Sequence, residues 1–314
     1  MQGFGGYPLV CHEILGETLL KRTLNRMRES GIGQPTVLYE ESGSESIFPS
    51  RVPRAGKFFH QWEAAVGEHL NQGADILVLI RLGAHLEVDF AKLLEFHRES
   101  SSILTQVYDR KSAFDTAVVS AQQLNCETGS YRGRLSALIP YHKRYEFSGY
   151  ANRLRGPQDF RKLAQDGLTG RSSIRPVGRE VSPGIWIGDG ADVDSTTRIT
   201  APAYIGAHTR VKGSCRINGA TTIERDCEVD FGTSVTDSSV LPGTYLGVGL
   251  NFVHSIVTAD RIFHIDRNVE VEISDPNLLG KRRSARTFVK SIAGKDFFNQ
   301  NNRQLKKADA HLYQ

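Results

Sequence analysis

An aliphatic residue recurs at every sixth position through much of the C-terminal half of the chain. The series runs Ile187, Val193, Ile199, Ile205, Val211, Ile217, Ile223, Val229 and Val235, and Leu241 extends it. A small residue lies four positions after each of the first nine: Ala191, Thr197, Ala203, Thr209, Cys215, Thr221, Cys227, Thr233 and Ser239. This period is typical of hexapeptide-repeat proteins, which coil as a left-handed parallel β-helix. Each hexapeptide then forms one side of a triangular prism, with the aliphatic side chain toward the axis and the small one at a corner.

The regular period covers about three coils, close to the minimum for a stacked repeat with a continuous core. It breaks at Pro242 and Gly243, and less regular strands are expected as far as Asp275. We therefore assign residues 183–275 to the β-helix and residues 171–182 to a linker. Cys215 and Cys227 fall on different sides of the prism, so we interpret them as packing residues and not as a disulfide or a metal site.

Several features of the whole chain indicate a protein of the cytoplasm. The four cysteines form no CxxC pair or other metal-ligand spacing, and such sparse usage suits a reducing compartment. The longest aliphatic run, residues 76–80, is far shorter than the ~20 residues of a membrane span, and the N-terminus lacks a signal-peptide pattern. The net charge of +4 is too small to indicate a nucleic-acid partner.

The N-terminal half alternates helix-period and strand-like segments. Helices are expected around residues 20–27, around residues 62–70 and after an N-cap at Asp89, and strands at residues 36–39, 76–80 and 103–108. This order indicates the α/β class. We expect a parallel-type sheet with helices on its faces, which binds ligands beyond the carboxyl ends of its strands.

The order of the parts resembles the sugar-phosphate nucleotidyltransferases, especially the mannose-1-phosphate guanylyltransferase and glucose-1-phosphate thymidylyltransferase group. The resemblance runs from about Pro8 to Leu241. It rests on Pro8-Leu9-Val10, on Leu15-Gly16, on Ser30-Gly31-Ile32, on residues 76–79 through Asp89-Phe90 to Phe96-His97, on Gly149-Tyr150 with residues 156–160, and on residues 201–206. It implies a nucleotidyltransferase-like (Rossmann-like) domain over residues 1–170, before the β-helix.

Members of that family join a nucleoside triphosphate to a sugar 1-phosphate, using Mg²⁺ held by carboxylates. The family's first metal-binding aspartate should fall near Gly83 or Ala84, and its second falls at Arg153, so neither carboxylate is present. The resemblance implies that the family's opening strand and Gly-rich nucleotide loop should precede Pro8. Only seven residues precede Pro8, so we expect this domain to be truncated at its N-terminus. Gly3, Gly5 and Gly6 are either a residual phosphate cradle or a simple Gly-rich end.

Arginine can replace a metal as a phosphate clamp, because its planar fork matches a phosphate bidentately. We therefore name Arg81, Arg153 and Arg155 as candidate phosphate contacts, with surface charges as the equally weighted alternative. The sequence predicts no metal site and identifies no catalytic residue. Mg²⁺ is expected as a cofactor only if pyrophosphorylase activity is retained.

The leading functional hypothesis is a degenerate member of this family in sugar-nucleotide or polysaccharide metabolism. It would bind a nucleotide-sugar or a sugar phosphate as a regulator or partner subunit, and a homo-oligomer is expected. One alternative is an active NDP-sugar pyrophosphorylase with a rearranged site. The other is a hexapeptide-repeat acyltransferase with His208, His254 or His264 as its base, although the spacing of these histidines supplies no three-ligand metal cluster.

The C-terminal residues 276–314 form a basic tail. Residues 277–314 hold nine cations and two carboxylates, a net charge of +7, which leaves −3 on the rest of the chain. Phe288, Phe297 and Phe298 lie in the same stretch. We interpret it as a solvated end, with a peripheral contact to a membrane surface or a partner as the alternative.

Overall fold

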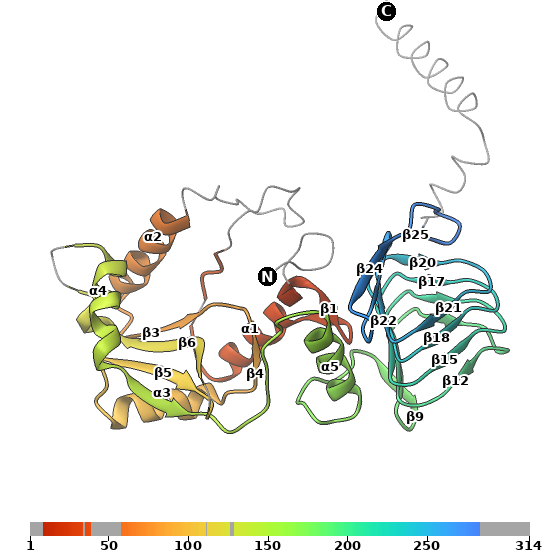
Figure 1. Ribbon diagram of the computed structural model, residues 1–314. Helices are drawn as coiled ribbons and strands as arrows, with labels where there is room; N and C mark the ends of the chain where they lie inside the picture. Colours follow the sequence, from red (N-terminus) through yellow and green to blue (C-terminus); the bar gives the residue numbers. More distant parts are fainter. Residues whose placement is uncertain (1–8, 34, 39–57, 111, 126–128, 283–314) are drawn as a thin grey trace, which may run out of the picture.

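The hexapeptide repeat folds into a β-solenoid with three flat faces in the computed structural model, which describes residues 9–33, 35–38, 58–110, 112–125 and 129–282. A mixed α/β part precedes the solenoid and lies beside it (Figure 1). The helices are α1 (Leu19–Glu29), α2 (Phe58–Asn71), α3 (Phe90–Glu99), α4 (Tyr131–Leu138) and α5 (Pro157–Leu168), with the 3-10 helices η2 (Leu9–Cys11), η4 (Ala121–Gln123) and η5 (Ile139–Tyr141). None of the described helices has the length and apolar character needed to cross a bilayer.

Each coil of the solenoid contributes one short strand to each face. The first face contains β10 (Ile185–Ile187), β13 (Ala203–Ile205), β16 (Thr221–Ile223), β19 (Ser239–Val240) and β22 (Ser255–Val257). The second face contains β11 (Asp192–Val193), β14 (Arg210–Val211), β17 (Glu228–Val229) and β20 (Thr244–Leu246). The third face contains β12 (Arg198–Ile199), β15 (Arg216–Asn218), β18 (Ser234–Thr236) and β21 (Asn251–Val253). Neighbouring strands of this set pair in parallel, and the four strands of the third face correspond to about four turns.

Four antiparallel strands extend these sheets. β9 (Arg179–Ser182) precedes the first coil, and β23 (Arg261–His264) and β24 (Val269–Glu272) continue the first face after the last coil. β25 (Leu279–Lys281) pairs with β20 on the second face, so residues at the start of the predicted tail lie on the solenoid. The three tail phenylalanines and the three N-terminal glycines lie outside the described residues. The solenoid has one more turn than the regular period indicates, because the irregular strands after Leu241 complete it.

The two positions of the repeat take the places that the sequence predicts. Ile205, Ile217 and Ile223 are fully buried inside the solenoid. The small residues from Ala203 to Ser239 in this series are buried too. Several of their side chains reach the backbone of the next coil: the Thr209 hydroxyl donates to the carbonyl of Glu224 at 2.7 Å. The Cys227 thiol makes the same contact with the carbonyl of Leu241 at 3.1 Å. A short side chain with one donor fits this slot, which explains why threonine, serine and cysteine recur there.

The two solenoid cysteines are packing residues, as predicted. Both are buried and free of disulfides. Burial raises the pKa of the Cys227 thiol to about 12, so this side chain stays a neutral thiol at physiological pH.

The extension of the period to Leu241 is wrong. Val240, not Leu241, pairs in register with Ile223 and joins the interior of the solenoid. Four residues, 236–239, separate the inward residues Val235 and Val240, whereas five, 218–222, separate Ile217 and Ile223 in the preceding coil. Asp237 makes this tighter corner with a left-handed φ of 45°. The lost residue turns Leu241 outward, into a second apolar cluster on the first face.

Most of the predicted N-terminal elements are present. α1, α2 and α3 cover the expected helices, and β3 (Ile76–Ile80) and β5 (Leu104–Tyr108) cover two expected strands. The Asp89 carboxylate caps α3 by accepting the backbone N–H of Lys92 at 3.2 Å. The strand predicted at 36–39 is absent over residues 36–38, and Tyr39 lies outside the described residues.

The expected parallel-type sheet is wrong, because the sheet is mixed. Its order is β3-β6-β5-β7, with β6 (Ala113–Ser120) antiparallel to both neighbours and β7 (Lys143–Glu146) parallel to β5. Residues 109–112 join β5 to β6 through a turn in which the Asp109 N–H donates to the carbonyl of Ser112. Such a short link permits a hairpin but not the crossover that parallel neighbours need.

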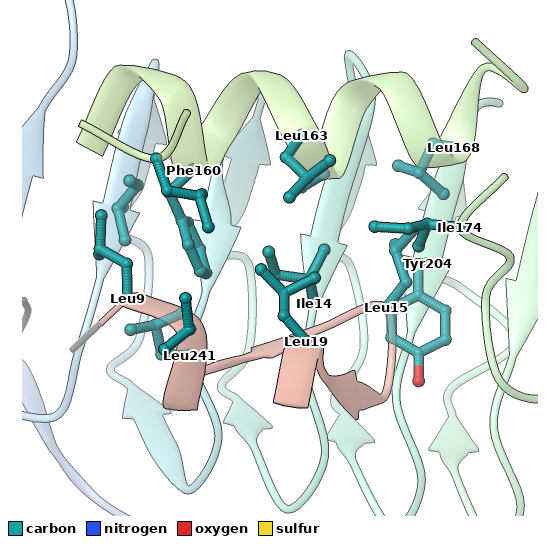
Figure 2. Close-up of a cluster of buried hydrophobic side chains, with 14 residues drawn as sticks. Leu9, Ile14, Leu15, Leu19, Phe160, Leu163, Leu168, Ile174, Tyr204 and Leu241 are labelled. Atoms are coloured by element: carbon teal, nitrogen blue, oxygen red, sulfur yellow. The ribbon is translucent and has the colours of Figure 1, made fainter. Parts of the chain in front are cut away.

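The N-terminal segment and α5 pack together on the first face of the solenoid. Figure 2 shows Phe160, Leu163 and Leu168 of α5 above this segment, with Tyr204 and Leu241 of the solenoid beside them. The segment includes η2, α1 and the two short strands β1 (Glu13–Ile14) and β2 (Glu17–Thr18). The two remaining strands of the α/β part, β4 (His85–Leu86) and β8 (Ala151–Asn152), pair with each other and carry the chain toward α5.

Candidate functional site

Two of the three candidate arginines lie at the same end of β6. Arg81 follows the last residue of β3, and Arg153 follows the last residue of β8. Arg81 contacts Asp115, and Arg153 contacts Ala113, so both reach the first residues of β6 from different strands. Because β3 pairs with β6 along its whole length, the end of β3 fixes Arg81 opposite the start of β6.

Arg81 forms an open ion pair at the surface. Its Nε and Nη2 donate to Oδ2 of Asp115 at 2.9 and 2.7 Å. The Arg81 side chain is 83% exposed and that of Asp115 is half-exposed. Exposed pairs of this kind contribute about 0–1 kcal/mol, so the pair can open at little cost when another anion competes for the guanidinium.

Arg153 is held more firmly. Its Nη2 donates to Oδ2 of Asp109 at 2.6 Å, and its Nη1 donates to the carbonyl of Ala113 at 3.3 Å. The guanidinium lies over the ring of Phe114, 4.1 Å from its centroid, which adds a cation–π contact. The side chain remains 25% exposed.

Arg155 is separated from the other two by the turn that follows β8. Leu154, between the two arginines, has a left-handed φ of 47° and is fully buried. The Asn152 side chain accepts the N–H of Leu154 at 2.9 Å, and Asp159 accepts the N–H of Arg155 at 2.9 Å. Within the described residues the Arg155 side chain forms no hydrogen bond or ion pair with β6.

The positions where the resembled family has metal-binding aspartates are Gly83 or Ala84, beside β4, and Arg153. No group of three or more histidine, cysteine, aspartate or glutamate side chains that could hold a metal ion occurs in the described part of the chain. The carboxylates nearest to this edge, Asp109 and Asp115, each accept from an arginine.

A second polar cluster joins α5 to the solenoid, and the sequence did not predict it. The buried Arg161 donates through Nη2 to Oδ1 of Asp237 at 2.6 Å and to the carbonyl of Ala220 at 2.8 Å. Oδ1 of Asp237 also accepts from Gln165 at 2.6 Å. Its other oxygen, Oδ2, lies 2.7 Å from Nδ1 of His254. Burial alone would raise the pKa of Asp237, but Arg161, Gln165 and His254 together hold it below its ordinary value.

The three solenoid histidines are placed differently from one another. His254 stacks directly above Asp237 at the corner between the third and first faces, with 45% of its side chain exposed. His208 forms a corner between the first and second faces with a φ of 57°, and its carbonyl accepts from Arg282. His264 ends β23. Of these three histidines, only His254 has a carboxylate partner among the ion pairs of the described residues.

A buried carboxylate anchors the N-terminal segment. Glu224, next to β16, accepts the backbone N–H groups of Leu15 and Gly16, each at 2.8 Å. Both donors have left-handed φ values, 56° and 87°, which point their N–H groups the same way. A side chain at position 16 would lie 2.4 Å from the Tyr204 hydroxyl, so only glycine fits. Burial raises the pKa of Glu224 to about 7.

Neither a protein-family model nor a curated protein matches the chain. The resemblance to the nucleotidyltransferases therefore remains a prediction from the motifs quoted above.

Proposed function

We propose that the chain is a degenerate member of the sugar-phosphate nucleotidyltransferases that binds a nucleotide-sugar or a sugar phosphate without turning it over. The observation that carries this proposal is that the Arg81 and Arg153 guanidiniums both contact the first residues of β6. Two guanidiniums from separate strands can hold one phosphate or two linked phosphates by charge-assisted hydrogen bonds. The ligand would serve a regulatory or partner-subunit role, in a homo-oligomer or in a complex with another chain.

The ion pairs at this edge suit a switchable phosphate contact. Asp109 and Asp115 each form an ion pair with one of the two arginines and so balance its charge when no ligand is present. A diphosphate carries more negative charge than either carboxylate and offers bidentate acceptors to both guanidiniums, so it can displace Asp115 from the exposed Arg81. Arg153, packed over Phe114, would keep its position and act as the fixed half of the clamp.

Ligand-induced thermal stabilisation tests the proposal. GDP-mannose, dTDP-glucose and mannose 1-phosphate are added with and without Mg²⁺, because a ligand of the native state raises its apparent stability. We expect a rise in Tm with at least one probe, without a requirement for Mg²⁺. Arg81→Gln, at an exposed position, should weaken binding about tenfold or more. Arg144→Gln is the matched control, since Arg144 is also exposed and paired, with Glu146 at 3.2 Å.

Other results of these experiments would contradict the proposed phosphate site or the proposed loss of catalysis. If no probe raises Tm, or if Arg81→Gln and Arg144→Gln bind alike, the phosphate site is not at this edge. Release of pyrophosphate from a nucleoside triphosphate and mannose 1-phosphate with Mg²⁺ would instead establish an active pyrophosphorylase with a rearranged site.

The pairing of His254 with Asp237 favours a second candidate, a hexapeptide-repeat acyltransferase. A carboxylate at Nδ1 orients an imidazole so that Nε2 can accept a proton from a hydroxyl or amine acceptor. We expect acetyl-CoA to raise Tm if this candidate is correct, and His254→Ala to abolish acetyl transfer while His208→Ala retains it. Equal activity of the two variants would exclude His254 as the base.

A further inference from the structure

The third face of the solenoid carries two adjacent arginines that pair with no carboxylate of the described residues. Arg198 of β12 and Arg216 of β15 are direct partners in the parallel register. Both are exposed, and the neighbouring Ile199 and Ile217 point inward, so the arginines point outward. Neither guanidinium has a hydrogen-bond or ion-pair partner among the residues that the structure describes. Like charges placed directly opposite each other in a sheet are unfavourable, so this row needs an explanation.

On the second face of the same solenoid, outward cations form ion pairs with carboxylates. There Arg210 lies between Asp192 and Glu228 in the register, and its Nε donates to Oδ2 of Asp192 at 3.2 Å. In the next row Lys212 Nζ lies 3.1 Å from a carboxylate oxygen of Glu228 and 3.1 Å from one of Asp230. Arg210 and Lys212 on the second face are thus each stacked against carboxylates of the adjacent coils. The third face departs from this pattern.

Apart from Val253, the other outward residues of the third face are polar and uncharged. The row of Arg198 and Arg216 continues with Ser234 and Asn251, and the next outward row consists of Thr200, Asn218, Thr236 and Val253. None of these outward positions holds an acidic or an aromatic residue. Figure 1 draws the four strands of this face on the side of the solenoid away from α5, so the described part of the α/β region does not cover it.

We propose that the third face of the solenoid binds a glycan that carries sulfate or phosphate groups. Adjacent strands lie about 4.8 Å apart, so one oxyanion can accept hydrogen bonds from both guanidiniums at once. The serine, threonine and asparagine side chains beyond them both donate and accept, which matches the hydroxyl groups of a sugar chain lying along the strands' stacking direction. The proposal concerns a different surface from the β6 edge and does not depend on the proposed function.

Other anionic partners fit this face less well. Single-stranded nucleic acids bind through aromatic side chains on which bases stack, and the outward rows contain none. A protein partner would need an apolar centre to its interface, whereas Val253 is the one apolar residue in these two rows. Phe231 is exposed, but it lies at the corner between the second and third faces.

Binding of the full-length protein to dextran sulfate tests this assignment. Two double variants remove the same charge: Arg198→Gln with Arg216→Gln on the third face, and Arg210→Gln with Lys212→Gln on the second. The basic tail is unchanged in both, so its contribution cancels. We expect about a tenfold or greater loss of affinity in the third-face variant and less than about a twofold change in the control. Neutral dextran should not bind, and the third-face variant should keep or raise Tm because a like-charge contact is removed.

Two results would overturn the proposal. Equal losses in the two double variants would mean that dextran sulfate responds to net charge alone. A loss for a twenty-nucleotide oligothymidylate as large as that for dextran sulfate would assign the face to nucleic-acid backbones, not to glycans.

Discussion

Replacing Arg161 with alanine is expected to lower the free energy of unfolding by about 3–5 kcal/mol, the usual cost of removing one partner of a buried ion pair. The Arg161 guanidinium donates to Asp237, to the Ser239 hydroxyl at 3.3 Å and to the carbonyl of Ala220. Burial lowers its pKa, while Asp237 opposes that shift. The variant would leave the Asp237 carboxylate without its strongest partner, and two corners of the solenoid would lose their link to α5.

Urea unfolding of the variant measures this effect. Arg210→Ala is the matched control, because Arg210 is also paired with an aspartate on the solenoid but is 55% exposed. We expect the control to change the free energy of unfolding by no more than about 1 kcal/mol. If the two variants lose equal stability, the contact between α5 and the solenoid does not stabilise the fold.

The second large effect concerns Glu224 and pH. Its pKa is raised from 4.5 to about 7 in the folded protein, so the folded state keeps a proton that the unfolded state has released. Stability from this group is therefore fully present below pH 4.5 and is lost as pH rises to 7. At about 1.4 kcal/mol per pKa unit the loss is on the order of 3 kcal/mol. Glu13 adds to the shift, whereas Arg22 and the N–H groups of Leu15 and Gly16 reduce it.

Glu224→Gln isolates this contribution, since glutamine does not ionise. We expect the stability of the natural protein relative to the variant to fall by about 3 kcal/mol between pH 4.5 and pH 8 in urea unfolding experiments. Glu228→Gln is the control, because Glu228 pairs with Lys212 on the solvent-facing second face. A difference between the natural protein and Glu224→Gln that does not vary with pH would show that folding does not shift the pKa of Glu224.

The interior of the solenoid could be predicted because the residues within each hexapeptide determine which side chains point inward. Each hexapeptide requires one aliphatic and one small residue at fixed positions. The inward position of Ile205 and the corner position of Thr209 could therefore be assigned without knowledge of the rest of the chain. The shortened spacing at Asp237 was missed, since Val240 is as aliphatic as Leu241. Periodicity alone cannot choose between two adjacent aliphatic residues, and the contact that decides, Leu241 with the α5 cluster, is remote in sequence.

The contacts that join the parts could not be predicted for the same reason. Arg161 and Asp237 are 76 positions apart, and Leu15 and Glu224 are 209 apart. Nothing in a charged residue's immediate neighbours distinguishes Arg161, which is buried, from Arg155, which is exposed on the same short stretch. The mixed sheet was missed because helix and strand periods give the order of elements but not strand direction. Strand direction depended on the short link at residues 109–112.

The packing of α5 and the N-terminal segment on the first face has a consequence for how the solenoid meets its surroundings. Because α5 and the N-terminal segment cover the first face, the three-sided solenoid presents only its second and third faces to solvent. On the second face Arg210 and Lys212 are paired with stacked carboxylates, whereas the arginine row of the third face has no carboxylate partner among the described residues. The unpaired positive charge of the solenoid therefore lies on the third face. Its electrostatic field attracts an approaching anion toward that face before any contact is made.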